Sequence, residues 1–297
     1  MVDLWTFGGL SLRELLKRTA RESWEDEVFG QAARLAFYHF IAIFPALLLV
    51  SAILSRLVAG AELLQTLQSS LRTVLPPRAS GFVTGFLNQI AMGNARHTLW
   101  FAVFGSLWAA FNGTWAVMSA LNAAYEVEER RSWWQVTLTA AGLTLTLALL
   151  GIASLVVLFL GQRFSSGVSV WFPIVQWPIL AVVLLVAFAA LYRFGPNLVD
   201  REMRWSTPGA VLAGILWLGT CGLFRAYITY QAAKYDQVYG SAGALVILLL
   251  WFYFTGAAIL IGGELNSEIE NAAAQHGHPD PRRPGEHRQG GVPAQRV

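Results

Sequence analysis

Charged side chains are missing from six long stretches of this 297-residue sequence. The stretches without Lys, Arg, Asp or Glu cover residues 35–55, 97–125, 132–162, 164–192, 205–224 and 237–263. A helix that crosses the hydrocarbon core of a membrane needs roughly 20 mostly apolar residues, because each residue adds about 1.5 Å of rise. Every stretch meets that length, so the sequence predicts six membrane-spanning helices.

Charge is also scarce in the chain as a whole. Only 13% of the residues are charged and 55% are hydrophobic, whereas a soluble domain carries about 25% charged residues. The sequence lacks the series of short alternating segments that a membrane β-barrel requires. The predicted fold class is therefore all-α, a polytopic bundle of six transmembrane helices with an amphipathic helical hairpin between the first and second spans.

The residues that metal or hydrolytic chemistry needs are few. Cys221 is the single cysteine, and no HExxH, CxxC or GxxxxGK[ST] motif occurs. Such sites need several His, Cys or carboxylate ligands that converge on one ion, or a glycine-rich loop for phosphate. We therefore expect no metal, no cofactor and no enzymatic activity. The net charge of +3 and the absence of a basic groove argue against nucleic acid as a partner.

The same patterns predict three regions. We expect a cytoplasmic amphipathic segment at 1–31, a membrane domain at 32–271 and a disordered cytoplasmic tail at 272–297. The predicted spans cover about 32–54, 98–122, 136–160, 174–193, 206–230 and 241–264, and the amphipathic hairpin covers about 62–95. Pro, Gly, Arg and His dominate the tail, a composition typical of disorder. Whether 80–95 is re-entrant or interfacial stays open.

The distribution of positive charge predicts the orientation. With the N-terminus inside, 14 of the 21 Lys and Arg residues lie on inner segments. Positive residues favour the cytoplasmic side of a membrane. We therefore expect both termini in the cytoplasm, because six spans return the chain to the side on which it started.

One group of polar residues is a candidate contact site for lipid or substrate. Arg225 lies near the outer end of the fifth span, beside Tyr227 and Tyr230, and Tyr38 and His39 lie in the first span. Ionisable residues inside a membrane often mark a functional site. Two structural explanations stay open: Arg225 can extend to the outer interface, and His39 can be a hydrogen-bonded structural residue.

A second candidate group is an inner-end polar network. Its members are Arg34, Arg193, Asn197, Glu264 and Asn266, which lie near the inner ends of different spans. Glu264 is expected at the level of Arg34 and Arg193, where an ion pair or helix-end packing would accommodate its charge. Asn197 and Asn266 are expected to hydrogen-bond between helices.

Three motifs give the chain a family resemblance. They are AARLAFYH at 32–39, continuing through Phe44-Pro45; LNAAYEV at 121–127, followed by ERRSW at 129–133; and YGSAGA at 239–244, followed by LWFY at 250–253 and GELN at 263–266. In this order they resemble the YihY/BrkB-type family of bacterial inner-membrane proteins. Arg34 and His39 depart from the family pattern.

The resemblance implies both an architecture and a cellular location. Family members have six spans and an amphipathic insertion after the first, and they lie in the bacterial inner membrane. Some carry a ribonuclease BN label from a mistaken assignment to tRNA processing. Others are linked to serum resistance and to transport of envelope lipids or lipopolysaccharide precursors.

Two hypotheses about function follow. The first is a transporter or flippase for an envelope lipid or another amphipathic anion, with membrane lipids, an anionic lipid or a lipopolysaccharide precursor as partners. The alternative is a non-transporting scaffold for envelope assembly. A ribonuclease is disfavoured because the sequence lacks aromatic residues interleaved with Lys and Arg for strand binding. The oligomeric state stays open.

Overall fold

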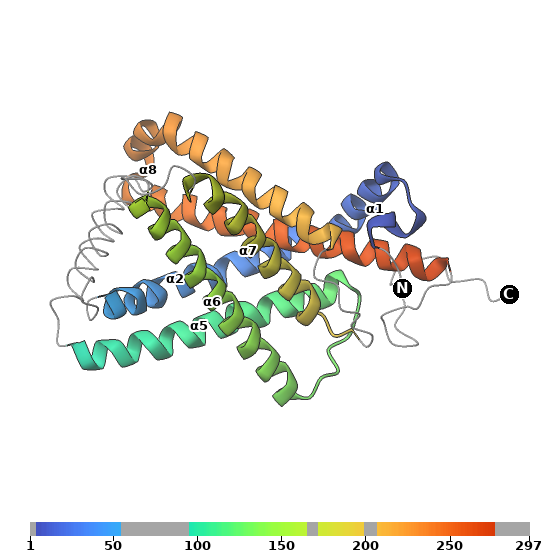
Figure 1. Ribbon diagram of the computed structural model, residues 1–297, viewed down its shortest axis with the longest axis horizontal. Coiled ribbons are helices and arrows are strands. Elements are labelled where there is room, and N and C mark those ends of the chain that lie inside the picture. The colour runs from blue at the N-terminus through green and yellow to red at the C-terminus, as the bar shows by residue number, and fades with distance from the viewer. Residues whose placement is uncertain (1–3, 55–94, 165–171, 199–206, 277–297) are drawn as a thin grey trace. The chain divides into compact units, whose positions relative to one another are not determined.

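The computed structural model describes residues 4–54, 95–164, 172–198 and 207–276 (Figure 1). Every regular element in these ranges is helical, which confirms the all-α class. The elements are η1 (Leu4–Gly9), α1 (Leu12–Glu25), α2 (Val28–Leu54), α5 (Ala95–Ala124), α6 (Trp133–Phe164), α7 (Phe172–Phe194) and α8 (Pro208–Gln275). The predicted hairpin at 62–95 falls on residues outside the described ranges, apart from its last residue.

Four helical segments among the described residues are long and apolar enough to cross a membrane. They are Trp133–Ser154, Ile174–Phe194, Pro208–Tyr227 and Leu245–Gln275. These segments overlap the third to sixth predicted spans, and the last of them continues beyond the predicted end at residue 264. Helices α2 and α5 cover the first two predicted spans, but that they cross the membrane stays a prediction, and so does the count of six.

Helix α6 shows how these segments present apolar side chains outward. Its large exposed apolar residues are Leu138, Leu145, Leu149, Ile152 and Val156. Their spacing of three, four or seven residues places them along one face of the helix. A continuous apolar face of this length suits contact with lipid better than contact with water.

Local signals explain where α1 begins and ends. Ser11 caps the helix, and its hydroxyl accepts a hydrogen bond from the Glu14 N–H at 3.2 Å, which satisfies one of the open donors at the helix start. Asp26 closes the other end. Glu27 follows with a left-handed φ of 52° and separates α1 from α2. Because α2 begins at Val28, it starts four residues before the predicted first span.

Glycine and proline residues also mark helix ends. Helix α7 ends at Phe194, directly before Gly195-Pro196. The Thr207 hydroxyl caps α8 by accepting from the Ala210 N–H at 3.1 Å, and Pro208 occupies the first turn, where its missing N–H costs nothing. At its other end α8 continues to Gln275, so the first four residues of the predicted tail are helical.

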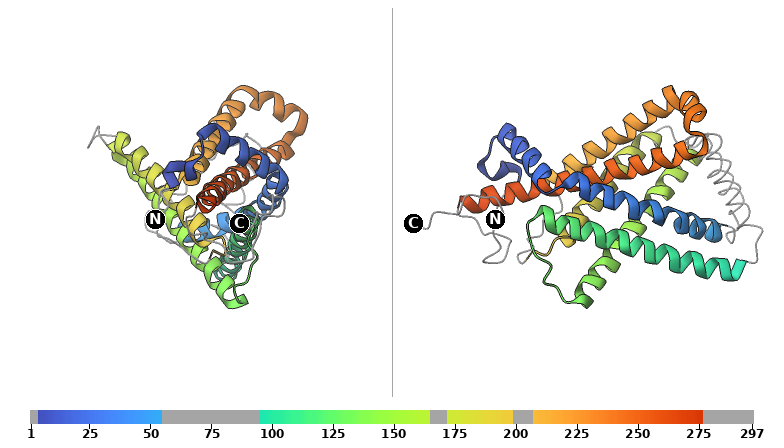
Figure 2. Two further views of the ribbon diagram at one scale, coloured as in Figure 1. Left: turned by 90° about the vertical axis from the view of Figure 1, so that its right-hand side faces the viewer. Right: turned by 180° about the vertical axis from the view of Figure 1, so that it is seen from behind.

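Helix α8 contains 68 residues and would be about 100 Å long if it were straight. Instead it folds back on itself (Figures 1 and 2). The Gly209 N–H, near its start, donates to Asn266 Oδ1 at 2.9 Å, and the rings of Trp217 and Trp251 lie 6.3 Å apart. The two arms are therefore antiparallel and correspond to the predicted fifth and sixth spans.

The chain forms two compact units. The first contains Met1–Gln31, Thr114–Leu216 and Ala257–Val297, and the second contains Ala32–Gly113 and Trp217–Gly256. In the first unit α6 and α7 pack side by side. All but one of the α8 residues between 257 and 269 are buried, so this part of α8 is enclosed on every side and forms the centre of the first unit.

Candidate functional site

Close backbone packing brings the two arms of α8 together in the first unit. A Cβ atom added to Gly262 would lie 2.5 Å from the Gly209 carbonyl oxygen and 2.9 Å from Ala213 Cβ. Only small residues allow helices to approach this closely. Tyr192, from α7, donates its hydroxyl to the Ile259 carbonyl at 2.7 Å. These contacts fix the position of the polar residues of α8 relative to the start of that helix and to α7.

Asn266 connects the start of α8 to its buried end. Its side-chain oxygen accepts from the Gly209 N–H at 2.9 Å, and its amide donates to Thr207 Oγ1 at 3.1 Å. Tyr125, which follows α5, also hydrogen-bonds to Asn266. Burial, with the nearby Glu270 charge, raises the pKa of the Tyr125 hydroxyl well above its ordinary value, so this hydroxyl stays neutral and available for hydrogen bonding.

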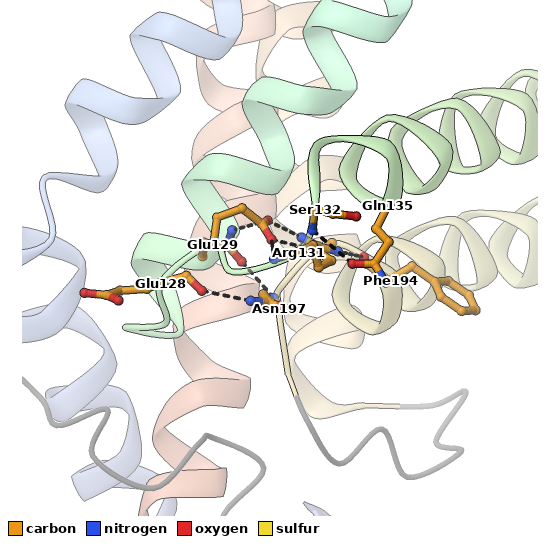
Figure 3. Close-up of polar contacts among 9 residues, drawn as sticks. Glu128, Glu129, Arg131, Ser132, Gln135, Phe194 and Asn197 are labelled. Carbon is orange, nitrogen blue, oxygen red and sulfur yellow. Dashed lines mark hydrogen bonds and ion pairs between the residues drawn. The ribbon is translucent and has the colours of Figure 1, made fainter.

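A second network joins the ends of α5 and α7 to the loop between α5 and α6 (Figure 3). The Asn122 side chain donates to Glu129 Oε2 at 2.9 Å and accepts from the Asn197 N–H at 2.8 Å. The Asn197 amide donates to the Glu128 carbonyl at 2.8 Å. Asn122 and Asn197 are both buried, and these bonds satisfy polar groups whose burial would otherwise be unfavourable.

Arg131 is the cation of this loop network. Its guanidinium binds both oxygens of Glu129, at 2.8 and 2.5 Å, and donates to the carbonyls of Phe194 and Gly195 at 3.2 and 2.9 Å. Partial burial acts to raise the pKa of Glu129, but the hydrogen bonds from Arg131 and Asn122 outweigh burial and hold that pKa below its usual value. The carboxylate is therefore ionised at neutral pH.

A third polar feature is a group of carboxyl side chains where α1 contacts the end of α8. Glu22, Glu264 and Glu268 are all at least 96% buried. Asp26, at the end of α1, hydrogen-bonds to Glu264. We call these four residues the carboxyl cluster. Ionisable groups in such surroundings are unfavourable unless they are paired, hydrogen-bonded or protonated.

Four of the five residues of the predicted inner-end network belong to the first unit. Asn197, Glu264 and Asn266 are buried there, and the Arg193 guanidinium lies over the Phe194 ring, 5.4 Å from its centroid. The groups that act most strongly on Glu264 are Asp26, Glu22 and Glu268, whereas the sequence pattern places Arg34 and Arg193 at its level. Arg34 belongs to the second unit and is exposed.

The predicted lipid-contact residues belong to the second unit. Arg225 and Tyr227 are exposed on the first arm of α8, and the Tyr230 side chain lies outside the described residues. A ring nitrogen of His39 lies 2.7 Å from the Leu35 carbonyl oxygen, and its ring lies 5.8 Å from that of Phe252. Half-buried Tyr38 packs against its neighbour Phe37. These contacts fit the structural explanation of His39.

Comparison with known proteins decides the family. The model of the family described as virulence factor BrkB matches residues 19–286. The chain belongs to the BrkB family. The match includes α1 from Thr19 onward, all the other described helices that follow it and the carboxyl cluster, which confirms the resemblance drawn from the sequence motifs.

Relatives of this BrkB-family chain have been found in several bacteria. YfkH of Bacillus subtilis (strain 168), which is named a ribonuclease-like protein, is 31% identical over 80% of this chain and 88% of its own length. A UPF0761 membrane protein of Xanthomonas oryzae pv. oryzae (strain PXO99A) is 28% identical over 82% of this chain, which spans only 58% of that longer relative. No solved structure matches the chain.

Sequence reasoning missed several residues of this BrkB-family site. Glu22, Asp26, Glu268 and Arg131 were not among the candidates, because each lies in a charged stretch that resembles a solvated surface. Glu268 carried a usable signal, since it follows Glu264 by one helical turn and therefore shares its face. Within the described residues no group of three or more His, Cys, Asp or Glu is arranged to hold a metal ion.

Proposed function

We propose that this BrkB-family membrane protein moves or flips an envelope lipid, or another amphipathic anion, across the bacterial inner membrane. The observation that carries the proposal is Arg225, an exposed cation in the last turns of the apolar segment Pro208–Tyr227. A cation at the end of a membrane segment attracts an anionic group at the same depth. We also propose that the protein is not an enzyme.

The surroundings of Arg225 suit a molecule with a charged head and apolar tails. Ile215, Leu218 and Leu223 are exposed on the same arm of α8, and exposed Tyr227 lies two residues beyond Arg225. A guanidinium binds phosphate and carboxylate groups with two parallel hydrogen bonds, and tyrosine favours the interface between lipid and water. An anionic lipid satisfies both requirements.

Reconstitution tests this role. The full chain is placed in lipid vesicles that contain a trace of labelled anionic phospholipid, labelled zwitterionic phospholipid or a labelled lipid A precursor. We expect accelerated exchange of one anionic probe between leaflets and a loss of at least fivefold in that rate for Arg225→Gln. Arg130→Gln is the matched control, because Arg130 is an exposed cation in the loop between α5 and α6. No movement of any probe contradicts the proposal.

A scaffold role is the second candidate, and helix α1 favours it. Leu12, Leu16 and Trp24 are exposed on this helix, next to the exposed cations Arg13 and Lys17. Such a surface fits an anionic membrane surface or a partner protein. Crosslinking from α1 that captured one stoichiometric envelope protein, together with no lipid movement in vesicles, would favour the scaffold.

A further inference from the structure

The carboxyl cluster brings together four acidic groups, of which Glu22, Glu264 and Glu268 are buried and Asp26 is half-buried. Glu22 and Asp26 come from α1, and Glu264 and Glu268 come from the enclosed end of α8. The exposed fractions of Glu22, Glu264 and Glu268 are 3%, 2% and 1%. Four negative charges at this burial would repel one another strongly, because the low dielectric of the interior screens them poorly. Some of the carboxyl groups must therefore be neutralised.

Arg21 neutralises one member. Its guanidinium lies 2.9 Å from Glu22 Oε1 and 3.4 Å from Glu25 Oε1, while its own side chain is 64% exposed. The Glu22 charge is thus paired with a cation that reaches the surface. Within the cluster Asp26, Glu22 and Glu268 act on Glu264, and Glu264 together with Glu270 and Tyr192 acts on the Tyr125 hydroxyl.

The contact between Asp26 and Glu264 indicates that a proton neutralises a second member of the cluster. These two side chains share a hydrogen bond, and two carboxyl groups can do so only when one of them carries a proton. The second Glu264 oxygen, Oε1, is buried without a hydrogen-bond partner among the described residues. A buried oxygen in that state is tolerable on a neutral carboxyl and very unfavourable on a charged one.

We propose that Asp26 and Glu264 form a proton-binding site in which one exchangeable hydrogen ion joins helix α1 to the end of α8. Removal of the proton leaves two neighbouring negative charges and breaks this hydrogen bond between the helices. The small apolar cluster of Leu15, Leu265 and Ile269 also attaches α1 to α8. The left-handed Glu27 that separates α1 from α2 provides a joint about which α1 can move.

The expected pH dependence has a definite sign. The docked state holds one proton more than the undocked state, in which the separated carboxyl groups ionise as they do in water. Stability falls as pH rises wherever the folded state binds more protons. Docking of α1 should therefore weaken as pH rises, whether or not the protein moves lipid.

Infrared difference spectroscopy of the full chain in lipid nanodiscs reads the proton directly. Lowering the pH should produce the C=O band of a protonated carboxyl group, and Glu264→Gln should remove it. Glu25→Gln is the matched control, because Glu25 lies on α1 with a half-exposed side chain and should leave the band unchanged. A band that persists when Asp26→Asn and Glu264→Gln are combined overturns the proposal.

Amide hydrogen exchange of α1 tests the consequence. We expect the amide-exchange protection factors of α1 to fall at least tenfold between the pH at which the infrared carboxyl band has its full intensity and the pH at which the band is absent. In Glu264→Gln the amide keeps the hydrogen bond without a proton, so the protection should become independent of pH. Asp26→Asn provides the same test if Glu264→Gln does not fold. Equal pH dependence in wild type and variants overturns the proposal. Loss of the infrared carboxyl band in sodium but not in potassium salts also overturns it, because the site would then bind a sodium ion in place of a proton.

Discussion

Arg131 shows how one residue within a run of charges takes on a structural role. Its neighbours Glu128 and Arg130 form an exposed ion pair at 3.2 Å, whereas the Arg131 side chain is only 7% exposed. The difference comes from the carbonyls of Phe194 and Gly195, more than 60 residues away in sequence. A sequence pattern cannot identify which arginine is buried, because the acceptors belong to another helix.

Replacing Arg131 by lysine should destabilise the protein. An ammonium group cannot bind the Glu129 carboxylate and two carbonyls at once, because its donors radiate from a single nitrogen. We expect a loss of about 2 kcal/mol in the free energy of unfolding in detergent micelles. Arg130→Lys, in the exposed pair, should change it by less than about 0.5 kcal/mol. Equal losses for the two variants would contradict this role for Arg131.

The candidate residues illustrate what sequence reasoning can and cannot supply. The sequence predicts that Asn197 and Asn266 hydrogen-bond between helices, and the structure places both in buried networks. The sequence predicts Glu264 at the inner end of the sixth span, because depth follows from position along an apolar run, and the structure shows that its side chain is buried. Its neighbours were not foreseen, since depth does not determine which helix packs against a given face. The contact with Asp26 depends on how α1 docks.

At the scale of elements, helix positions were largely predictable and helix contacts were not. Length and hydropathy are local properties, so the four observed apolar segments overlap the predicted spans. The start of α8 lies two residues after the predicted start of the fifth span, and the Thr207 cap and Pro208 explain where the helix begins. Its end at Gln275 was not predicted, because composition alone assigned 272–275 to the tail. Buried Ala272 and Ala273 explain the extension, since both lie against Gly8 of η1.

The crossing of the two α8 arms should tolerate no added methyl group. Gly262→Ala would place Cβ against the Gly209 carbonyl, Ala213 and the Tyr192 hydroxyl, and overpacking of this kind costs about 1–3 kcal/mol. Gly219→Ala is the matched control on the same helix, where a Cβ would meet nothing within 4 Å. Thermal unfolding should show a lower midpoint for the first variant alone. Equal midpoints would mean that the arms do not pack at Gly262.

At the scale of the whole molecule, contact between the two ends of the chain constrains its topology. Leu15 packs on Leu265 and Ile269, and Gly8 lies against the backbone of Ile269. Residues that precede the first predicted span therefore contact residues that follow the last. We propose from this contact that both ends lie on one side of the membrane, which makes the number of crossings between them even. We propose six crossings, with both ends in the cytoplasm.

Thiol labelling tests this topology. In a Cys221→Ala background, single cysteines are introduced at the exposed positions Ala20 and Gln275. A maleimide that cannot cross membranes should label both in inverted vesicles and neither in intact spheroplasts, because both should face the cytoplasm. Labelling of the two positions from opposite sides would contradict the even count. Labelling of both from the outside would reverse the orientation.

The first compact unit is assembled from three separate parts of the chain, Met1–Gln31, Thr114–Leu216 and Ala257–Val297. Because a ribosome releases the N-terminus first, η1 and α1 leave it long before the final arm of α8 against which they pack. Their apolar and acidic side chains therefore lack these partners until the final arm of α8 has been synthesised. A nascent chain that stops before residue 257 would lack the centre of this unit. The side chains of η1 and α1 that pack against that centre would then be accessible to quality-control proteases.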